Sequence, residues 1–366
     1  MHTLFKITLG IFVFMSTFVA IQEFQKKIIP LYIPQENIRT VSTPTQQKTG
    51  VLPKIKEKTS KEVPEAPIKQ TQTTTPPPAI IIPEPEKPQI EVINFDSINK
   101  QTRLALVNIF CTTKTDTLHP LSGSGVFIDS KGIILTNAHV GQYFLLPEYI
   151  NCVIRTGNPS YPTYKAKLLY ISSTWLTENA SQINQTNPMG TGENDYALLI
   201  VTERIPKDDF PIETSFIKTS LEKTSLNDYM LLASYPAEFL GGISISRNLY
   251  MVSSIAQVTE VFTFKEQTVD LFSIGGTVLS QKGSSGGAVV NKNVLLSGLI
   301  VTATESKQTS DRDLRAISTS HIDRSLREET GLGLEQTLRE ASIEKQQSFE
   351  SSQIPLLRKT LLDQLK

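Results

Sequence analysis

The most constraining feature of this chain is a long middle region in which apolar residues come only in short runs. Between about residues 96 and 325, the apolar and β-branched runs are separated by Gly, Pro, Asn and Asp. Short runs broken in this way predict a β-sandwich or β-barrel rather than alternating βαβ units. Fifteen of the 19 glycines lie here, as tight connections between strands require. Examples of such runs lie at 104–110, 125–128, 132–135, 196–201, 230–233, 249–252, 288–290 and 295–301.

Three polar residues stand at the ends of such runs. His139 follows one run, Asp195 directly precedes another, and Ser285 lies in the small-residue loop 283–287. Taken singly, each is ordinary: a structural histidine, a turn aspartate and a serine in a glycine-rich loop. Together they occur in the order His, Asp, Ser, which is one of the three known chain orders of the Ser-His-Asp triad. The set predicts Ser285 as nucleophile, His139 as general base and Asp195 as the group that orients the imidazole.

The loop 283–287 also matches G-x-S-x-G, the nucleophile motif of α/β-hydrolases. That motif requires a helix after the serine, with the acid and the histidine further along the chain. Here the residues after the loop predict strands, and the only later histidine is His321. We therefore set the esterase interpretation aside.

The residues around the three motifs resemble the trypsin-like serine proteases, and most closely the HtrA-type bacterial branch. The similar stretches are GSGVFID at 123–129, GIILTNAHV at 132–140, DYALL at 195–199 and GSSGG at 283–287. The resemblance covers roughly residues 96 to 325. It implies an all-β fold of two six-stranded antiparallel barrels, with His139 and Asp195 from the first and Ser285 from the second. It also implies protein or peptide substrates and no cofactor.

Further roles follow only from this resemblance. The backbone N–H groups of Gly283 and Ser285 are expected to form the oxyanion hole. Ser284 stands where zymogen-type relatives carry an aspartate, so we expect activity without an N-terminal clip. The resemblance places the substrate pocket at Leu279 and along Gly298, Leu299, Ile300 and Val301. Since these pocket residues include no acid, we expect small or apolar P1 side chains.

Composition excludes several other classes of function. The chain has 36 Lys+Arg against 36 Asp+Glu, so no basic balance indicates nucleic-acid binding. Two cysteines cannot form an all-Cys zinc site, and the four histidines form no metal-ligand motif, so we expect no metal. Cys111 and Cys152 flank His139. In an exported chain they predict a disulfide within the first barrel, with two buried free thiols as the alternative.

The two ends of the chain differ from its middle. Residues 1–24 combine Lys6 with an uncharged apolar run and predict either a membrane anchor through residues 4–24 or a signal peptide that is cleaved. Residues 25–95 hold most of the prolines and predict a disordered linker. Leucines at helical spacing predict a helical tail at 326–366. The tail is too short for the PDZ domain that HtrA-type enzymes usually carry.

The sequence thus predicts four parts: an anchor at 1–24, a linker at 25–95, a protease domain at 96–325 and a helical tail at 326–366. The predicted function is a serine endopeptidase on the outer side of the cytoplasmic membrane, or a secreted one if the signal is cleaved. The alternative is a catalytically silent protease-fold protein that binds partners as an anchored scaffold. The sequence leaves the oligomeric state open.

Overall fold

The computed structural model describes residues 93–115, 118–183, 185, 192–208, 210–264 and 267–364. The predicted anchor at 1–24 lies outside these residues, and so does the predicted linker apart from its last three positions. None of the helices in the described part of the chain combines the length and apolarity of a membrane span. The described residues therefore cover most of the predicted protease domain and its tail.

A short helix leads into the first barrel. Helix α2, Phe95–Ala105, begins after Asn94, whose side chain accepts a hydrogen bond from the Ser97 N–H at 3.0 Å. The apolar run at 104–110 is therefore not all strand, because its first two residues end this helix. Six antiparallel strands then form a closed barrel in the order β1-β2-β3-β6-β5-β4, as predicted. They are β1 Leu106–Thr113, β2 Leu121–Asp129, β3 Ile133–Thr136, β4 Ile150–Thr156, β5 Tyr161–Ile171 and β6 Ala197–Arg204.

The second half of the domain is a seven-stranded antiparallel sheet, where the prediction was a second six-stranded barrel. Its order is β8-β7-β11-β12-β13-β10-β9. The two edge strands are consecutive, and the Val258 N–H bonds to Asp228 O while the Thr259 N–H bonds to Ser273 O. One bent segment, residues 252–262, thus carries both edge strands. The strands are β7 Tyr229–Ser234, β8 Val252–Gln257, β9 Glu260–Phe262, β10 Leu271–Ser273, β11 Ala288–Val290, β12 Leu296–Ala303 and β13 Leu314–Ser318.

Strand alternation divides the core into two clusters. Along β12, Leu299 and Val301 belong to the larger cluster, which also contains the interior of the first barrel. Ile300 points to the other side and packs with Phe272 in the smaller cluster of the second sheet. Successive strand side chains face opposite sides, so one strand supplies both clusters and couples the two halves of the domain.

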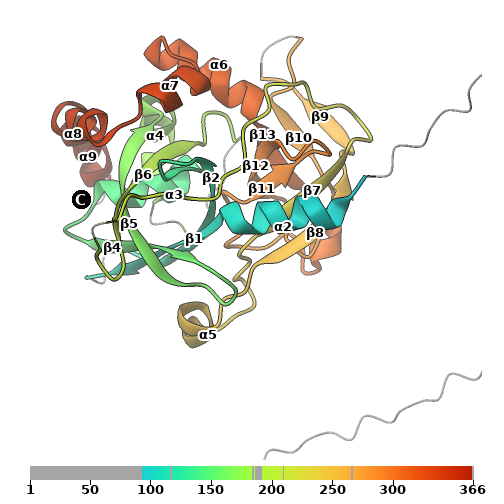
Figure 1. The fold of residues 1–366 in the computed structure, drawn as a ribbon, viewed down its shortest axis with the longest axis horizontal. Helices are drawn as coiled ribbons and strands as arrows, with labels where there is room; N and C mark the ends of the chain where they lie inside the picture. Colours follow the sequence, from blue (N-terminus) through green and yellow to red (C-terminus); the bar gives the residue numbers. More distant parts are fainter. Residues whose placement is uncertain are drawn as a thin grey trace, which may run out of the picture. The chain divides into compact units, whose positions relative to one another are not determined.

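The C-terminal tail is helical, as predicted, but its first helix begins earlier than residue 326. Helix α6 begins at Thr319, where the Ser318 hydroxyl accepts the His321 N–H at 3.1 Å, and it ends at Gly331 in the left-handed region. The helices turn back onto the first barrel, with α8 against β5 and α9 against α4 (Figure 1). They are α6 Thr319–Thr330, α7 Leu334–Glu340, α8 Ile343–Ser352 and α9 Ile354–Asp363, and α4 is Ser173–Asn179.

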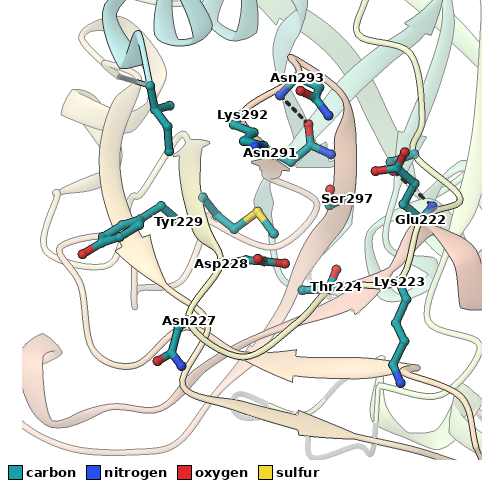
Figure 2. Close-up of a pocket in the computed structure, with 13 residues that line it drawn as sticks. Glu222, Lys223, Thr224, Asn227, Asp228, Tyr229, Asn291, Lys292, Asn293 and Ser297 are labelled. Atoms are coloured by element: carbon teal, nitrogen blue, oxygen red, sulfur yellow. Dashed lines mark hydrogen bonds between the residues drawn. The ribbon is translucent and has the colours of Figure 1, made fainter. Parts of the chain in front are cut away.

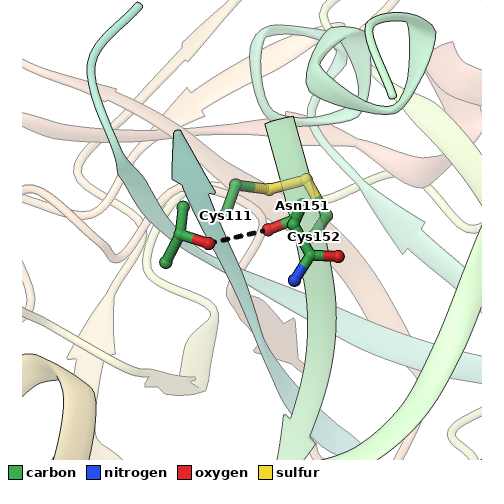
Figure 3. Close-up of a disulfide and its surroundings, with 4 residues drawn as sticks. Cys111, Asn151 and Cys152 are labelled. Carbon is green, nitrogen blue, oxygen red and sulfur yellow. Dashed lines mark hydrogen bonds between the residues drawn. A yellow bond between two sulfur atoms is a disulfide. The ribbon is translucent and has the colours of Figure 1, made fainter. Parts of the chain in front are cut away.

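Cys111 and Cys152 form a disulfide, as predicted (Figure 3). The two residues lie directly opposite each other where β1 pairs with β4. Cys111 is fully buried in the first barrel. The bridge therefore joins two neighbouring strands of the barrel that carries His139, and the alternative of two free thiols is wrong.

Candidate active site

His139 lies on one turn of helix at the end of a buried strand. Strand β3 ends at Thr136, and α3, Ala138–Gly141, follows after a single residue. That residue, Asn137, is fully buried, and its side-chain amide donates to Asp195 O at 3.0 Å. The predicted base and the predicted acid are thus drawn together from positions 56 residues apart.

The carboxylate of Asp195 holds His139 at two points. Oδ2 accepts from the imidazole Nδ1–H at 2.8 Å, and Oδ1 accepts from the His139 backbone N–H at 2.9 Å. Burial lowers the pKa of His139, but the charge of Asp195 and its hydrogen bond raise it, so the pKa lies above the ordinary value of 6.5. This arrangement selects the tautomer in which Nε2 is the free, basic nitrogen.

Helix α6 supports the segment that carries Asp195. The Ser325 hydroxyl donates to the side chain of Asn194 at 2.6 Å, and the Tyr196 hydroxyl donates to Ser325 at 2.9 Å. Asn194 adopts φ 58°, a left-handed conformation that asparagine tolerates better than most residues. Both neighbours of the acid are therefore held by a helix that follows the second sheet.

The loop that carries Ser285 lies against the strands that lead to His139. Gly286 has φ 81°, and a Cβ placed there would lie 2.1 Å from Ser124 O and 2.5 Å from Thr136 Oγ1. Only glycine fits such an approach. The Ser124 N–H also donates to Ser285 O at 2.8 Å. The loop of the second sheet is thus seated on β2 and β3, beside the strand end from which His139 emerges.

Ser285 is half-buried. Within the described residues, the Ser285 hydroxyl forms no hydrogen bond with His139. The Ser285 loop nevertheless packs against Thr136, the last residue of β3, and His139 follows that strand on α3. Likewise, no group in the described residues accepts the backbone N–H of Gly283 or of Ser285. Strand β11 begins three residues after Ser285, where an α/β-hydrolase would have a helix, so the fold excludes the esterase interpretation.

Two residues to which the sequence assigned no role in the site hold this loop. Ser124 Oγ donates to Gly283 O at 2.8 Å and accepts the Tyr235 N–H at 2.9 Å. Thr136 Oγ1 donates to Ser124 O at 2.7 Å. The only sequence signal for Ser124 is its place between two glycines in the stretch 123–129, and nothing local indicates its partners 111 and 159 residues away.

The predicted pocket residues fall into two groups. Leu279 and Ile300 are buried together in the smaller cluster, inside the second sheet. Leu299 and Val301 face the larger cluster, and Val301 lies against Gly192, three residues before the acid. At Gly298 a Cβ would lie 2.8 Å from the Phe272 ring, so this position leaves no room for a side chain. The four side chains thus do not share one face of the sheet.

A polar cavity of about 320 Å³ lies at the opposite end of the second sheet (Figure 2). It is formed where β7 begins and where β11 ends, whereas Ser285 precedes β11. Its lining includes Thr224, Asp228, Tyr229, Asn291 and Ser297. This cavity is therefore separate from the His139–Asp195 pair. Within the described residues, no group of three or more His, Cys, Asp or Glu side chains is arranged to hold a metal ion.

Known structures with similar folds have low sequence identity to this chain. The active form of the Rv3671c protease from M. tuberculosis is 15% identical, with a TM-score of 0.42, over 68% of this chain and 93% of that one. The serine endoprotease from Yersinia pestis is 17% identical, with a TM-score of 0.43, over 68% of this chain and 67% of that one. An HtrA-type protease with a tripeptide is 14% identical, with a TM-score of 0.42, over 66% of this chain and 65% of that one.

No curated protein matches the chain. The family model for trypsin matches residues 105–320, which is more than half of the 366 residues. The match begins one residue before β1 and ends at the start of α6, so it contains both halves of the domain and all three motif residues. The chain therefore belongs to the trypsin family of serine proteases.

Proposed function

We propose that this protein is a serine endopeptidase in which His139, Asp195 and Ser285 form the catalytic triad. The observation that carries the proposal is the double hydrogen bond from His139 to the buried Asp195 carboxylate, at 2.8 and 2.9 Å. It leaves Nε2 as the only imidazole nitrogen able to accept a proton. The Ser285 loop is held beside this pair by Ser124.

The proposed reaction proceeds through an acyl-enzyme. Ser285 Oγ attacks the carbonyl carbon of the scissile bond while His139 Nε2 takes the hydroxyl proton. The N–H groups of Gly283 and Ser285 stabilise the developing oxyanion, and His139 then gives its proton to the leaving amine. Water attacks the acyl-enzyme by the same route, which releases the new carboxyl end and restores the Ser285 hydroxyl.

The proposed specificity is for small or apolar P1 residues, in the manner of an HtrA-type enzyme. Leu279 and Ile300, which share the interior of the second sheet, support it because neither supplies a charge to bind a basic side chain. A series of peptide substrates that differ only at P1 tests this. We expect Ala or Val to be cleaved at least about tenfold faster than Arg, which corresponds to about 1.4 kcal/mol. Faster cleavage after Arg contradicts the assignment.

We also propose that no N-terminal cleavage is needed for activity. The Ser284 hydroxyl accepts a hydrogen bond from the Ser234 hydroxyl at 2.9 Å, and both side chains are buried. A serine carries no charge, and the partner of Ser284 lies within the second sheet. No new N-terminus is therefore needed to neutralise a buried carboxylate at this position. The full-length chain is expected to be active, and activity that appears only after cleavage near residue 100 contradicts this proposal.

The proposed location is the outer side of the cytoplasmic membrane, with residues 4–24 as anchor. The disulfide supports export, because disulfides persist in oxidising compartments. Protease added to intact cells should digest the domain, and a cleaved signal should instead release it into the medium. Protection of the domain until the cells are lysed contradicts an extracytoplasmic location.

The central experiment compares the full-length chain with Ser285→Ala in two assays: cleavage of unfolded casein and labelling by a fluorophosphonate probe. Both signals are expected for the natural chain, and both should vanish in the variant. The control is Ser351→Ala, which changes an exposed serine of α8. Absence of cleavage and of labelling dependent on Ser285 favours the binding-scaffold alternative.

A further inference from the structure

The loop after β7 contacts the Ser285 loop through both peptide groups of Lys282. The Ala237 N–H donates to Lys282 O at 2.8 Å. On the other side, the Lys282 N–H donates to the Glu238 carboxylate at 3.3 Å. The residue that precedes Gly283 is thus held by two neighbours from a different strand connection.

The bond from Ala237 determines the direction of the Gly283 N–H. A trans peptide is planar, and its C=O and N–H point in opposite directions. Since the Lys282 carbonyl faces Ala237, the N–H of the same peptide faces away from it. Gly283 lies close against this loop, with φ 93° and its would-be Cβ 2.7 Å from Tyr235 O. The N–H therefore points away from the packed side of the loop, and no group in the described residues accepts it.

Arg312 fixes the carboxylate that takes part in this contact. Its two terminal nitrogens donate to the two oxygens of Glu238 at 2.6 and 2.9 Å. The same guanidinium donates to Ser280 O at 2.6 Å and to Ser306 O at 2.8 Å. Only 11% of the Arg312 side chain and 22% of the Glu238 side chain are exposed, so water screens this pair less than a surface ion pair. Planar bidentate pairs of this kind restrict geometry strongly.

We propose that Glu238 and Arg312 are positioning residues that hold the Gly283 N–H toward the oxyanion. Neither residue touches the reacting atoms. Arg312 joins three chain segments, and Glu238 connects it to the peptide that precedes Gly283. This inference rests on the proposed function, since the oxyanion exists only if Ser285 attacks a carbonyl. Without the pair, Lys282 keeps only its bond from Ala237. The Lys282–Gly283 peptide then turns more readily, and one of the two oxyanion donors is weakened.

The test uses full-length Glu238→Ala and Arg312→Met, with Glu238→Gln as the conservative variant. The matched control is Glu203→Ala, which breaks the ion pair between Glu203 and Lys165 on the first barrel, at 2.8 Å. Two measurements are made: amide hydrogen exchange across residues 280–287, and steady-state kinetics on a peptide substrate, which give kcat and KM. The exchange measurement needs no activity.

We expect exchange in this segment to be at least about tenfold faster in Glu238→Ala and Arg312→Met, and unchanged in Glu203→Ala. For the same two variants, kcat should fall by about 10- to 1000-fold, which is up to the cost of one oxyanion donor, while KM stays within about threefold. Glu238→Gln keeps an acceptor for Arg312 and for the Lys282 N–H, so it should recover part of kcat.

Exchange or kcat at the level of the natural chain in both variants overturns the inference. A loss of kcat that is matched by loss of the thermal transition also overturns it, since the pair would then be only structural. If the natural chain shows no peptidase activity, the proposed function is wrong. The exchange rates still decide whether the Glu238–Arg312 pair holds the loop.

Discussion

At the scale of single residues, the site depends on buried polar groups whose hydrogen bonds go to specific partners. Asp195 is 5% exposed and accepts both hydrogen bonds from His139, so its charge acts in a region of low dielectric. The glycines of the Ser285 loop are needed because neighbouring atoms leave no room for a side chain. At Gly286, for example, an added Cβ would overlap Ser124 O. Small changes at these positions therefore have large effects.

The pKa of His139 leads to a prediction about the pH dependence of activity. The neutral imidazole is the active form, and Asp195 raises the pKa above 6.5, so kcat/KM should fall as the pH drops through a value above 6.5. Asp195→Asn removes the charge that raises the pKa, while burial still lowers it. The acid limb should then move below 6.5, and kcat should fall by about 10⁴-fold because the tautomer is no longer held.

The control is Asp208→Asn, an exposed aspartate near Arg204. Its pH–rate profile should coincide with that of the natural chain. An acid limb that stays in place in Asp195→Asn contradicts the assignment of Asp195 as the partner of His139.

At the scale of elements, the first barrel is closed by hydrogen bonds and reinforced by one covalent link. The disulfide joins β1 to β4 and closes a loop with a sequence separation of 41 residues. A crosslink stabilises mainly because it restricts the unfolded chain. Replacing Cys111 and Cys152 together by Ser should lower the free energy of unfolding by about 2–4 kcal/mol. Urea unfolding of the variant and of the natural chain measures this, and equal midpoints contradict it.

The C-terminal helices give a second prediction at this scale. Leu361 of α9 is fully buried, whereas Leu356 of the same helix is 65% exposed. Leu361→Ala should lower the free energy of unfolding by about 2–5 kcal/mol, since it leaves a cavity between the helix and the barrel. Leu356→Ala is the matched control and should cost less than about 0.5 kcal/mol. Equal effects of the two changes contradict the packing of α9 on the first barrel.

At the scale of the whole molecule, buried hydrogen bonds join the two halves of the domain in addition to the apolar cluster that they share. Ser124 of β2 contributes three of them, to Gly283 O, the Tyr235 N–H and Ser285 O. Ser124→Ala leaves the Tyr235 N–H and Gly283 O without this partner, at about 1–3 kcal/mol for each group. We also expect slower labelling of Ser285 by fluorophosphonate, because its loop loses its support. Labelling and stability equal to those of Ser351→Ala contradict this role.

The local patterns of the chain predicted whether a segment is a strand, a loop or a helix where its residue types favour only one of these. Short apolar runs predicted strands such as β3, β7 and β11, small residues predicted the Ser285 loop, and spaced leucines predicted the tail helices. The run at 249–252, by contrast, overlaps β8 only at Val252. The boundaries were less accurate. Helix α6 begins at Thr319 because the Ser318 side chain caps it, and the run at 104–110 begins inside α2. In both cases a local hydrogen bond or a packing contact overrides the apolar pattern.

The sequence by itself determined the all-β class, the three motif residues and their order, because these depend on residue type and spacing along the chain. Only the tertiary structure decided which side chains meet. The Ser124–Gly283 bond joins positions 159 residues apart, and Arg312 reaches Glu238 across 74 residues. Such contacts depend on how strands that are distant in the sequence are brought together, and no local periodicity encodes them. The support of the site, unlike its motifs, is therefore a property of the folded domain.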